Sequence, residues 1–150
     1  MKANYELLPL LTIKYKRNAK MLSKQIKSSL DAAEVLRSMY DADTLEYCES
    51  AIVIYLSQSN TTIGWQKVSQ GGITGTVMDP RIIIGTALKI GAVAMIISHN
   101  HPSGNLKSSR ADDELTAKIV QACKFFDMRL SDHIIITTDS YYSYADDGNL

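Results

Sequence analysis

Short, almost wholly apolar runs recur along this 150-residue chain, and several have the length of a buried β-strand. They are rich in β-branched residues, which fit the pleated surface of a sheet better than a helix. Residues 51–56 and 61–68 flank a polar turn cluster at 57–60 and so predict a hairpin. The full set of predicted strands is 11–16, 51–56, 61–68, 92–97, 133–138 and 141–145.

Three other stretches place their apolar residues on one face of a helix. The first covers residues 31–40, the second runs from Asp79 to Gly91, and the third and longest opens at Ser108 or Ser109. The apolar stripe of the third helix is Leu115, Ile119, Ala122 and Phe126. This order of elements, a hairpin followed by helix, strand, helix and strand, predicts a mixed α/β domain with a three-layer or sandwich-like architecture.

Charge is balanced over the whole chain but not along it. Lys+Arg and Asp+Glu both number 16, whereas residues 1–28 hold seven basic residues against the single acid Glu6, a net charge of +6. Proteins that bind nucleic acid through bulk phosphate attraction usually carry a basic surplus, which the whole chain lacks. The basic arm at 1–28 therefore leaves two alternatives, a solvated face or contact with DNA.

Cys48 and Cys123 form neither a CxxC pair nor a dense framework, which favours reduced thiols and a cytoplasmic protein. The apolar run at 7–11 is short and interrupted by Pro9, so no signal peptide is expected. No apolar stretch approaches the roughly 18 residues that span a bilayer, and no membrane association is expected.

Two histidines stand where the strand predicted at 92–97 ends. Because side chains alternate along an extended chain, the His99-x-His101 spacing puts both imidazoles on the same side. Pro102 then turns the chain and Gly104 permits a tight loop. Two imidazoles that converge from a rigid strand end are suited to a zinc ion.

Asp112 follows in the first turn of the long helix, where the helix dipole favours an ionised carboxylate. Two histidines and one carboxylate leave a coordination position for water, which is typical of catalytic zinc. Each fragment also has a structural explanation: Ser109-x-x-Asp112 by itself is a helix cap, and His-x-His by itself is a weak signal.

The combined order, His-x-His-Pro with Ser-x-x-Asp beginning after a gap of seven residues from the second His, resembles the signature of the JAMM (MPN+) metalloproteases. The longer matches HNHPSG, SRADDELT and Asp132-His133 resemble the RadC-like branch of that family over residues 30–150. The resemblance implies a mixed-sheet, cytidine-deaminase-like three-layer domain at 29–150. Full-length RadC proteins carry an N-terminal helical hairpin region, for which this chain is too short.

The resemblance also implies residue roles and one Zn²⁺ per chain, held by His99, His101 and Asp112. Glu49, 50 residues before His99, matches the family's general base, and Glu46 is a weaker match. The family usually has an aromatic two residues after that Glu, where this chain has Ala51.

Further roles follow from the same resemblance. Ser109 matches a serine that helps to hold the oxyanion, and Asp132 and His133 match a pair expected to support a ligand. The implied activity is peptide or isopeptide hydrolysis of an unknown protein substrate. Two alternatives remain: a DNA-repair-associated or nucleic-acid-binding accessory protein, and a catalytically silent domain that keeps its metal for structure.

Overall fold

The computed structural model describes residues 12, 14, 23–71 and 77–150 of the chain. Within these residues three helices and one five-stranded sheet are formed. The helices are α1 (Ser29–Arg37), α2 (Pro80–Ile90) and α3 (Arg110–Phe125). The strands are β1 (Ser50–Leu56), β2 (Thr62–Gln70), β3 (Ala94–Asn100), β4 (Arg129–Ile136) and β5 (Tyr141–Ser143).

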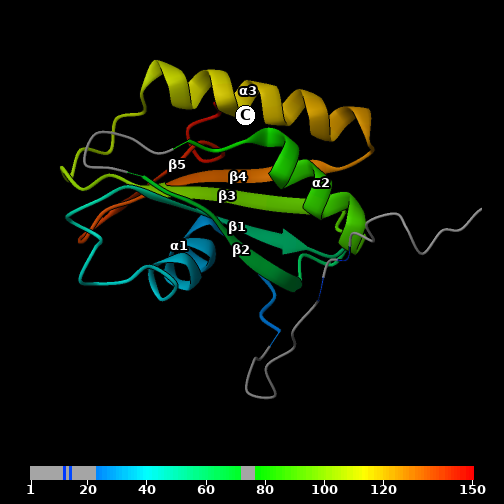
Figure 1. Cartoon of the computed structure of the whole chain (residues 1–150), viewed down its shortest axis with the longest axis horizontal. Helices are drawn as coiled ribbons and strands as arrows, with labels where there is room; N and C mark the ends of the chain where they lie inside the picture. The colour runs from blue at the N-terminus through cyan, green and yellow to red at the C-terminus, as the bar shows by residue number, and fades with distance from the viewer. Residues whose placement is uncertain (1–11, 13, 15–22, 72–76) are drawn as a thin grey trace, which may run out of the picture.

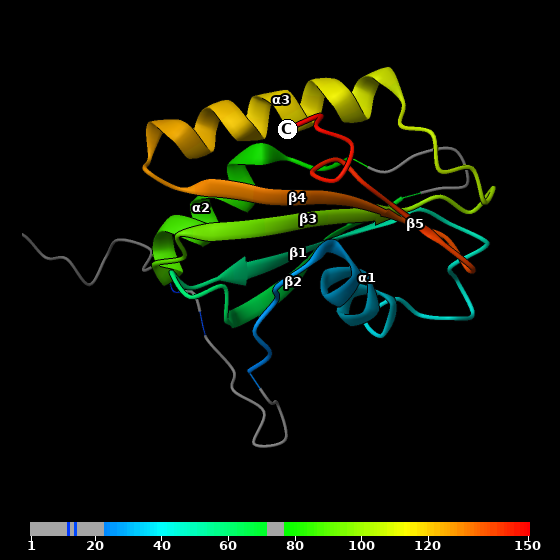
Figure 2. The same cartoon turned by 180° about the vertical axis from the view of Figure 1, so that it is seen from behind.

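The sheet lies between two helical layers. Its strand order is β2-β1-β3-β4-β5, with α2 and α3 on one face and α1 on the other (Figures 1 and 2). The β3–β4 pair is parallel and the other pairs are antiparallel. This arrangement confirms the predicted three-layer α/β fold with a mixed sheet.

Alternation along the strands divides the apolar residues between two cores. On β1, Ala51, Val53 and Tyr55 pack with α2 and α3, whereas Ile52 and Ile54 pack on the side of α1. All seven residues of β1 and all seven of β3 are buried, because helices cover both faces of the central strands. The centre of the sheet is therefore a rigid base for the side chains at the end of β3.

The ends of α1 and α2 are formed by residue types that commonly cap helices. The Ser28 side chain accepts a hydrogen bond from the backbone N–H of Asp31 and caps α1. Asp79 caps α2, Pro80 occupies its first turn, and Gly91 ends it with a left-handed φ of 68°. The predicted limits of α2 are confirmed, and α1 ends earlier than predicted, at Arg37.

The predictions for β4 and for the end of α3 are also wrong in detail. β4 begins at Arg129 rather than at residue 133, because parallel pairing with β3 extends it and a register shift accommodates the extra length. Phe126 does not continue the buried stripe of α3: the helix ends at Phe125, Asp127 turns with a φ of 53°, and Phe126 is 43% exposed.

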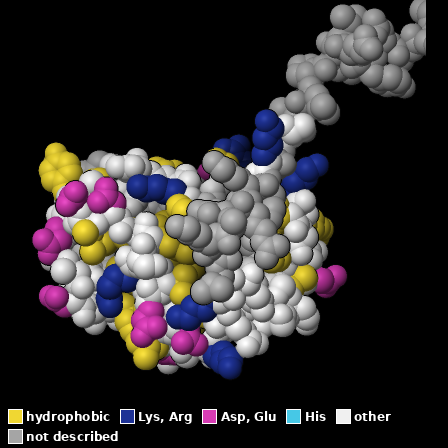
Figure 3. Space-filling view, turned by 90° about the horizontal axis from the view of Figure 1, so that it is seen from below, with side chains coloured by type: hydrophobic (Ala, Val, Ile, Leu, Met, Phe, Trp, Pro, Cys, Tyr) yellow, Lys and Arg dark blue, Asp and Glu magenta, His cyan; other side chains and the backbone are white. Residues whose placement is uncertain are grey.

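Both signs of charge occur on the described surface of the α1 side, where Lys and Arg side chains are interspersed with Asp and Glu (Figure 3). Most of the strand predicted at 11–16 and most of the basic arm at 1–28 lie outside the described residues. In the part of the chain that the structure describes, no helix combines the length and the apolar character needed to cross a membrane.

Candidate metal centre

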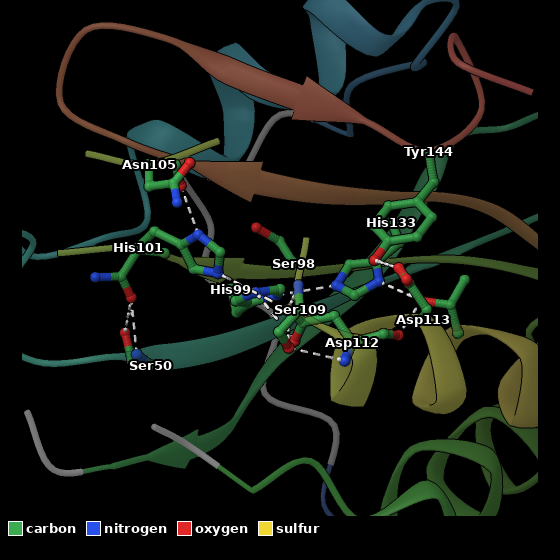
Figure 4. A network of polar contacts seen from close by, with 12 residues as sticks. Ser50, Ser98, His99, His101, Asn105, Ser109, Asp112, Asp113, His133 and Tyr144 are labelled. Atoms are coloured by element: carbon green, nitrogen blue, oxygen red, sulfur yellow. Dashed lines mark hydrogen bonds and ion pairs between the residues drawn. The ribbon is translucent and has the colours of Figure 1, made fainter. Parts of the chain in front are cut away.

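The carboxyl end of β3 carries the two histidines of the sequence pattern. His99 lies within the strand and is 2% exposed, and His101 follows it and is 13% exposed. Gly104 then turns the chain with a φ of 75°, a conformation that side chains with a Cβ seldom adopt. Figure 4 shows that both rings point toward the first turn of α3.

Asp112 completes a cluster with these histidines, as predicted from their spacing. One potential ligand atom from each of the three residues lies within 4.8 Å of the others. His99 Nε2 is 2.9 Å from His101 Nε2 and 3.4 Å from Asp112 Oδ1, and His101 Nε2 is 3.9 Å from Asp112 Oδ2. Ligands bound tetrahedrally to zinc at about 2.0–2.1 Å are about 3.3–3.4 Å apart. Of the three measured separations, one is shorter than this value, one equals it and one is longer.

Ser109 orients the carboxylate of Asp112 through a capping box. The backbone N–H of Ser109 donates to Asp112 Oδ2 at 2.8 Å, and the Ser109 hydroxyl donates to the same oxygen at 2.6 Å. Partial burial acts to raise the pKa of Asp112, but the contacts with His99 and Ser109 outweigh it and hold that pKa well below its usual range. Asp112 is therefore ionised at neutral pH, the form that binds a cation.

His101 is held in one tautomer by the backbone. Its Nδ1 lies 2.6 Å from the carbonyl oxygen of Asn105, and a carbonyl oxygen only accepts hydrogen bonds. The hydrogen of a neutral His101 ring is consequently on Nδ1, and the lone pair on Nε2 faces His99 and Asp112. A backbone partner on the second nitrogen is the usual support of a metal-binding histidine.

His133, which the sequence predicts as support for a ligand, lies directly behind His99. Its Nε2 is 2.9 Å from His99 Nδ1, and its Nδ1 is 2.6 Å from the hydroxyl of Thr116. Tyr144 stacks on the His133 ring with an interplanar angle of 7°, and its hydroxyl donates to Asp113 (Figure 4). Burial, followed by the neighbouring His99, lowers the pKa of His133 well below its usual range, so this ring is neutral at pH 7.

The sequence reasoning missed Thr116, Tyr144 and Asn105. Thr116 is four residues after Asp112 on α3, and residues at that spacing share a helix face. That spacing was a usable signal for Thr116. Tyr144 comes from a distant segment and Asn105 contributes only its carbonyl oxygen, so no sequence pattern predicts either contact.

Asp132 is placed away from the three clustered residues. Its carboxylate accepts hydrogen bonds from the Ser143 hydroxyl at 2.6 Å and from the backbone N–H of Ala145 at 3.1 Å. Burial raises the pKa of Asp132, although these hydrogen bonds oppose the effect. Asp132 therefore fastens β4 to the segment that carries Tyr144, and it also forms a hydrogen bond with the backbone of the adjacent His133.

Glu49 immediately precedes β1 and is half-buried. The β1–β3 register ends with Ala51 opposite His99, so Glu49, two residues before Ala51, lies at the same end of the sheet as the two histidines. Glu46 is engaged elsewhere, because its carboxylate accepts a hydrogen bond from Thr138 at 2.8 Å. The engagement of Glu46 with Thr138 thus favours Glu49 over Glu46 as the candidate base.

Asn100 fixes the segment on both sides of Glu49. Its buried side chain accepts from the backbone N–H of Ser50 at 2.7 Å and donates to the carbonyl oxygens of Leu45 and Cys48 at 2.7 and 3.0 Å. The residue between the two histidines therefore points to the opposite face and holds the backbone that presents Glu49.

The donor set fits a zinc ion. Two imidazole nitrogens and one carboxylate oxygen are a ligand set typical of catalytic zinc, and the hydrogen bonds on the far side of both rings supply the usual support. The cluster is only partly buried, because the side chains of His101 and Asp112 are 13% and 16% exposed.

Comparison with known proteins places this cluster in a family context. The sequence pattern of the RadC-like JAB domain matches residues 26–149. A UPF0758 protein of Flavobacterium johnsoniae is 40% identical over 125 residues, 83% of this chain and 53% of that protein.

Two further UPF0758 proteins are similar over shorter or weaker matches. One from Haemophilus ducreyi is 34% identical over 90% of this chain and 64% of its own length. UPF0758 protein YfjY of Escherichia coli K12 is 38% identical over 68% of this chain and 64% of its own length. The chain therefore spans between about half and two thirds of each of these three relatives, whose names state no activity.

Proposed function

The chain belongs to the RadC-like JAB domain family, and we propose that within it this protein is a zinc-dependent hydrolase that cleaves a peptide or isopeptide bond. The observation that carries the proposal is the convergence of His99, His101 and Asp112 at the end of the central strand. An ionised Asp112 and the bare Nε2 of His101 together make a site for a cation.

The proposed roles follow from the position of each residue. His99, His101 and Asp112 hold one Zn²⁺ ion per chain. When bound, the ion supplies Lewis acidity, which lowers the pKa of a water ligand from 15.7 toward about 7. Glu49, directly before β1 at the same end of the sheet, removes a proton from the attacking water and returns it to the leaving amine.

Ser109 has two proposed roles that compete for one hydrogen. In the structure its hydroxyl donates to Asp112 and orients that carboxylate. To stabilise an oxyanion, the hydroxyl has to turn from Asp112 toward the substrate, while the backbone N–H of Ser109 continues to hold Asp112. The two donors of Ser109 allow the carboxylate to remain oriented during such a change.

The first experiment measures the zinc content of the purified protein by elemental mass spectrometry. We expect about one zinc per chain in the wild type and its loss in His99→Ala. A wild type that neither contains zinc nor takes it up on titration would refute the proposed metal site.

The second experiment tests the base with a matched pair of variants. Glu49→Gln and Glu46→Gln are assayed on a mixed library of fluorogenic peptides, alongside their zinc content. Glu49→Gln should retain zinc and lose turnover, whereas Glu46→Gln, whose carboxylate is tied to Thr138, should retain both. Normal cleavage by Glu49→Gln would show that another group is the base.

A further inference from the structure

A groove of about 440 Å³ runs along α3 and begins next to the candidate metal centre. One wall is the helix, and the other includes Tyr144, Asn149 and Leu150 from the segment that follows β5 and lies beside α3 (Figure 2). At its upper end the groove is lined by Asp113, which directly follows the proposed ligand Asp112. Its volume is within the range of pockets that bind small ligands, roughly 300–1,000 Å³.

The wall formed by α3 is a single stripe of the helix. Its residues recur at spacings of three or four and therefore share one face: Asp113, Ala117, Val120 and Lys124. With a rise of about 1.5 Å per residue, the distance from Asp113 to Lys124 along the helix axis is roughly 16 Å. An extended chain advances about 3.3 Å per residue, so the groove has the length of about five residues of extended peptide.

The two ends of this stripe carry opposite charges. Asp113 is exposed at the end near the metal centre, and its Oδ1 accepts a hydrogen bond from the Tyr144 hydroxyl at 2.7 Å. Lys124 is exposed at the far end. In the described part of the chain neither side chain forms an ion pair. Both charges are therefore available to a bound molecule.

The middle of the groove suits a polypeptide better than a nucleic acid. Ala117 and Val120 supply an apolar strip, and Gln121 adds an exposed amide, which both donates and accepts hydrogen bonds as a peptide backbone requires. A groove for single-stranded nucleic acid is positively charged along its length and offers aromatic rings for stacking. Here a single lysine stands at one end and a carboxylate at the other.

We propose that this groove binds an extended stretch of the peptide substrate, with a basic side chain at Asp113 and an acidic side chain at Lys124, about five residues apart. The inference rests on the proposed hydrolase function and adds the class of substrate, a chain with opposite charges at that spacing. Asp113 and Asp112 are successive residues of the first turns of α3, so a peptide in the groove has its basic residue close to the metal centre (Figure 4). The bond to be cleaved then lies near that basic residue.

Peptide binding is measured by nitrogen-15 NMR titration of the full chain in the presence of a chelator, so that no cleavage occurs. The probes are end-capped peptides in which x is Ala or Ser: Arg-x4-Glu, Glu-x4-Arg, Arg-x4-Arg, and an isomer of the first with Arg and Glu adjacent. One of the two opposite-charge peptides should bind about 3- to 10-fold more tightly than the isomer, because two exposed ion pairs each contribute modestly. The amides that shift should belong to the groove.

A charge reversal at the far end tests the assignment of Lys124. Lys124→Glu should lose the preference for the opposite-charge peptide and bind Arg-x4-Arg more tightly than the wild type does. The matched control is Lys118→Glu, an exposed lysine of the same helix that lies near Asp79 and outside the groove, and it should behave as the wild type. Asp113→Asn, which keeps an oxygen to accept from Tyr144, should weaken binding of the arginine-containing peptides.

The results that overturn the inference differ from those that overturn the proposed function. Equal binding of the four peptides, shifted amides outside the groove, or an unchanged preference in Lys124→Glu would each refute the groove as a peptide site. A wild type without zinc or turnover would refute the proposed hydrolase, while the charge preference, measured without metal, would still establish the groove as a peptide site.

Discussion

Replacing Asn100 by alanine tests whether one buried amide holds the segment that presents Glu49. The side chain is 0% exposed and forms three short hydrogen bonds with backbone groups of Leu45, Cys48 and Ser50. A typical intramolecular hydrogen bond contributes a net ~1 kcal/mol, so the three together contribute about 3 kcal/mol to the free energy of unfolding. For a chain of 150 residues this corresponds to a decrease in Tm of about 6–12 °C.

The assay is urea and thermal unfolding of the metal-free protein, followed by circular dichroism. Metal-free protein is used so that a change in zinc affinity does not enter the free energy of unfolding. The matched control is Asn149→Ala, which removes an exposed amide that donates to Tyr142 and should change stability by less than about 0.5 kcal/mol. A loss below about 1 kcal/mol for Asn100→Ala would refute the reasoning, because it would mean that the three backbone groups find other partners.

Three other perturbations have defined outcomes. Zinc at about 100-fold above its dissociation constant should stabilise the fold by about 2.7 kcal/mol, and a chelator should reverse the rise in Tm; an unchanged Tm would contradict binding to the folded state. Ser109→Ala and Ser28→Ala each remove an N-cap worth about 1 kcal/mol by denaturant unfolding, but only Ser109→Ala should weaken zinc binding, because only that hydroxyl donates to Asp112. Leu36→Ala should destabilise the protein by about 2–5 kcal/mol without changing zinc affinity, since this fully buried side chain lies on the α1 side of the sheet; a loss under 1 kcal/mol would contradict its place in that core.

The elements with strong local signals were predictable from the sequence. Asp79, Pro80 and Gly91 mark the ends of α2, and the run at 51–56 defines β1 almost to the residue. The start of β4 was not predictable, because Arg129 joins the sheet through pairing with Val93 and β3 rather than through its own preference for a strand. Such a boundary is set by pairing with a strand that is distant in the sequence, and local strand propensity does not reveal it.

The candidate site shows the same division. The spacing of His99, His101 and Asp112 and the order strand, loop and helix are local features, and the structure brings these residues together. Thr116 and Tyr144 support the site through contacts with His133 that depend on how α3 and the end of the chain pack on the sheet. No periodicity encodes those contacts, so they had to be found in the structure.

The parallel pairing of β3 with β4 places the proposed ligands and the proposed base on different segments of the chain. One strand–helix–strand unit, residues 94–136, contains all three proposed ligands together with Thr116 and His133. Glu49 arrives from the hairpin on the other side of β3. The proposed metal ligands and the proposed general base thus come from different segments of the chain. Changes confined to the hairpin would therefore alter the proposed base and leave the three proposed ligands in place.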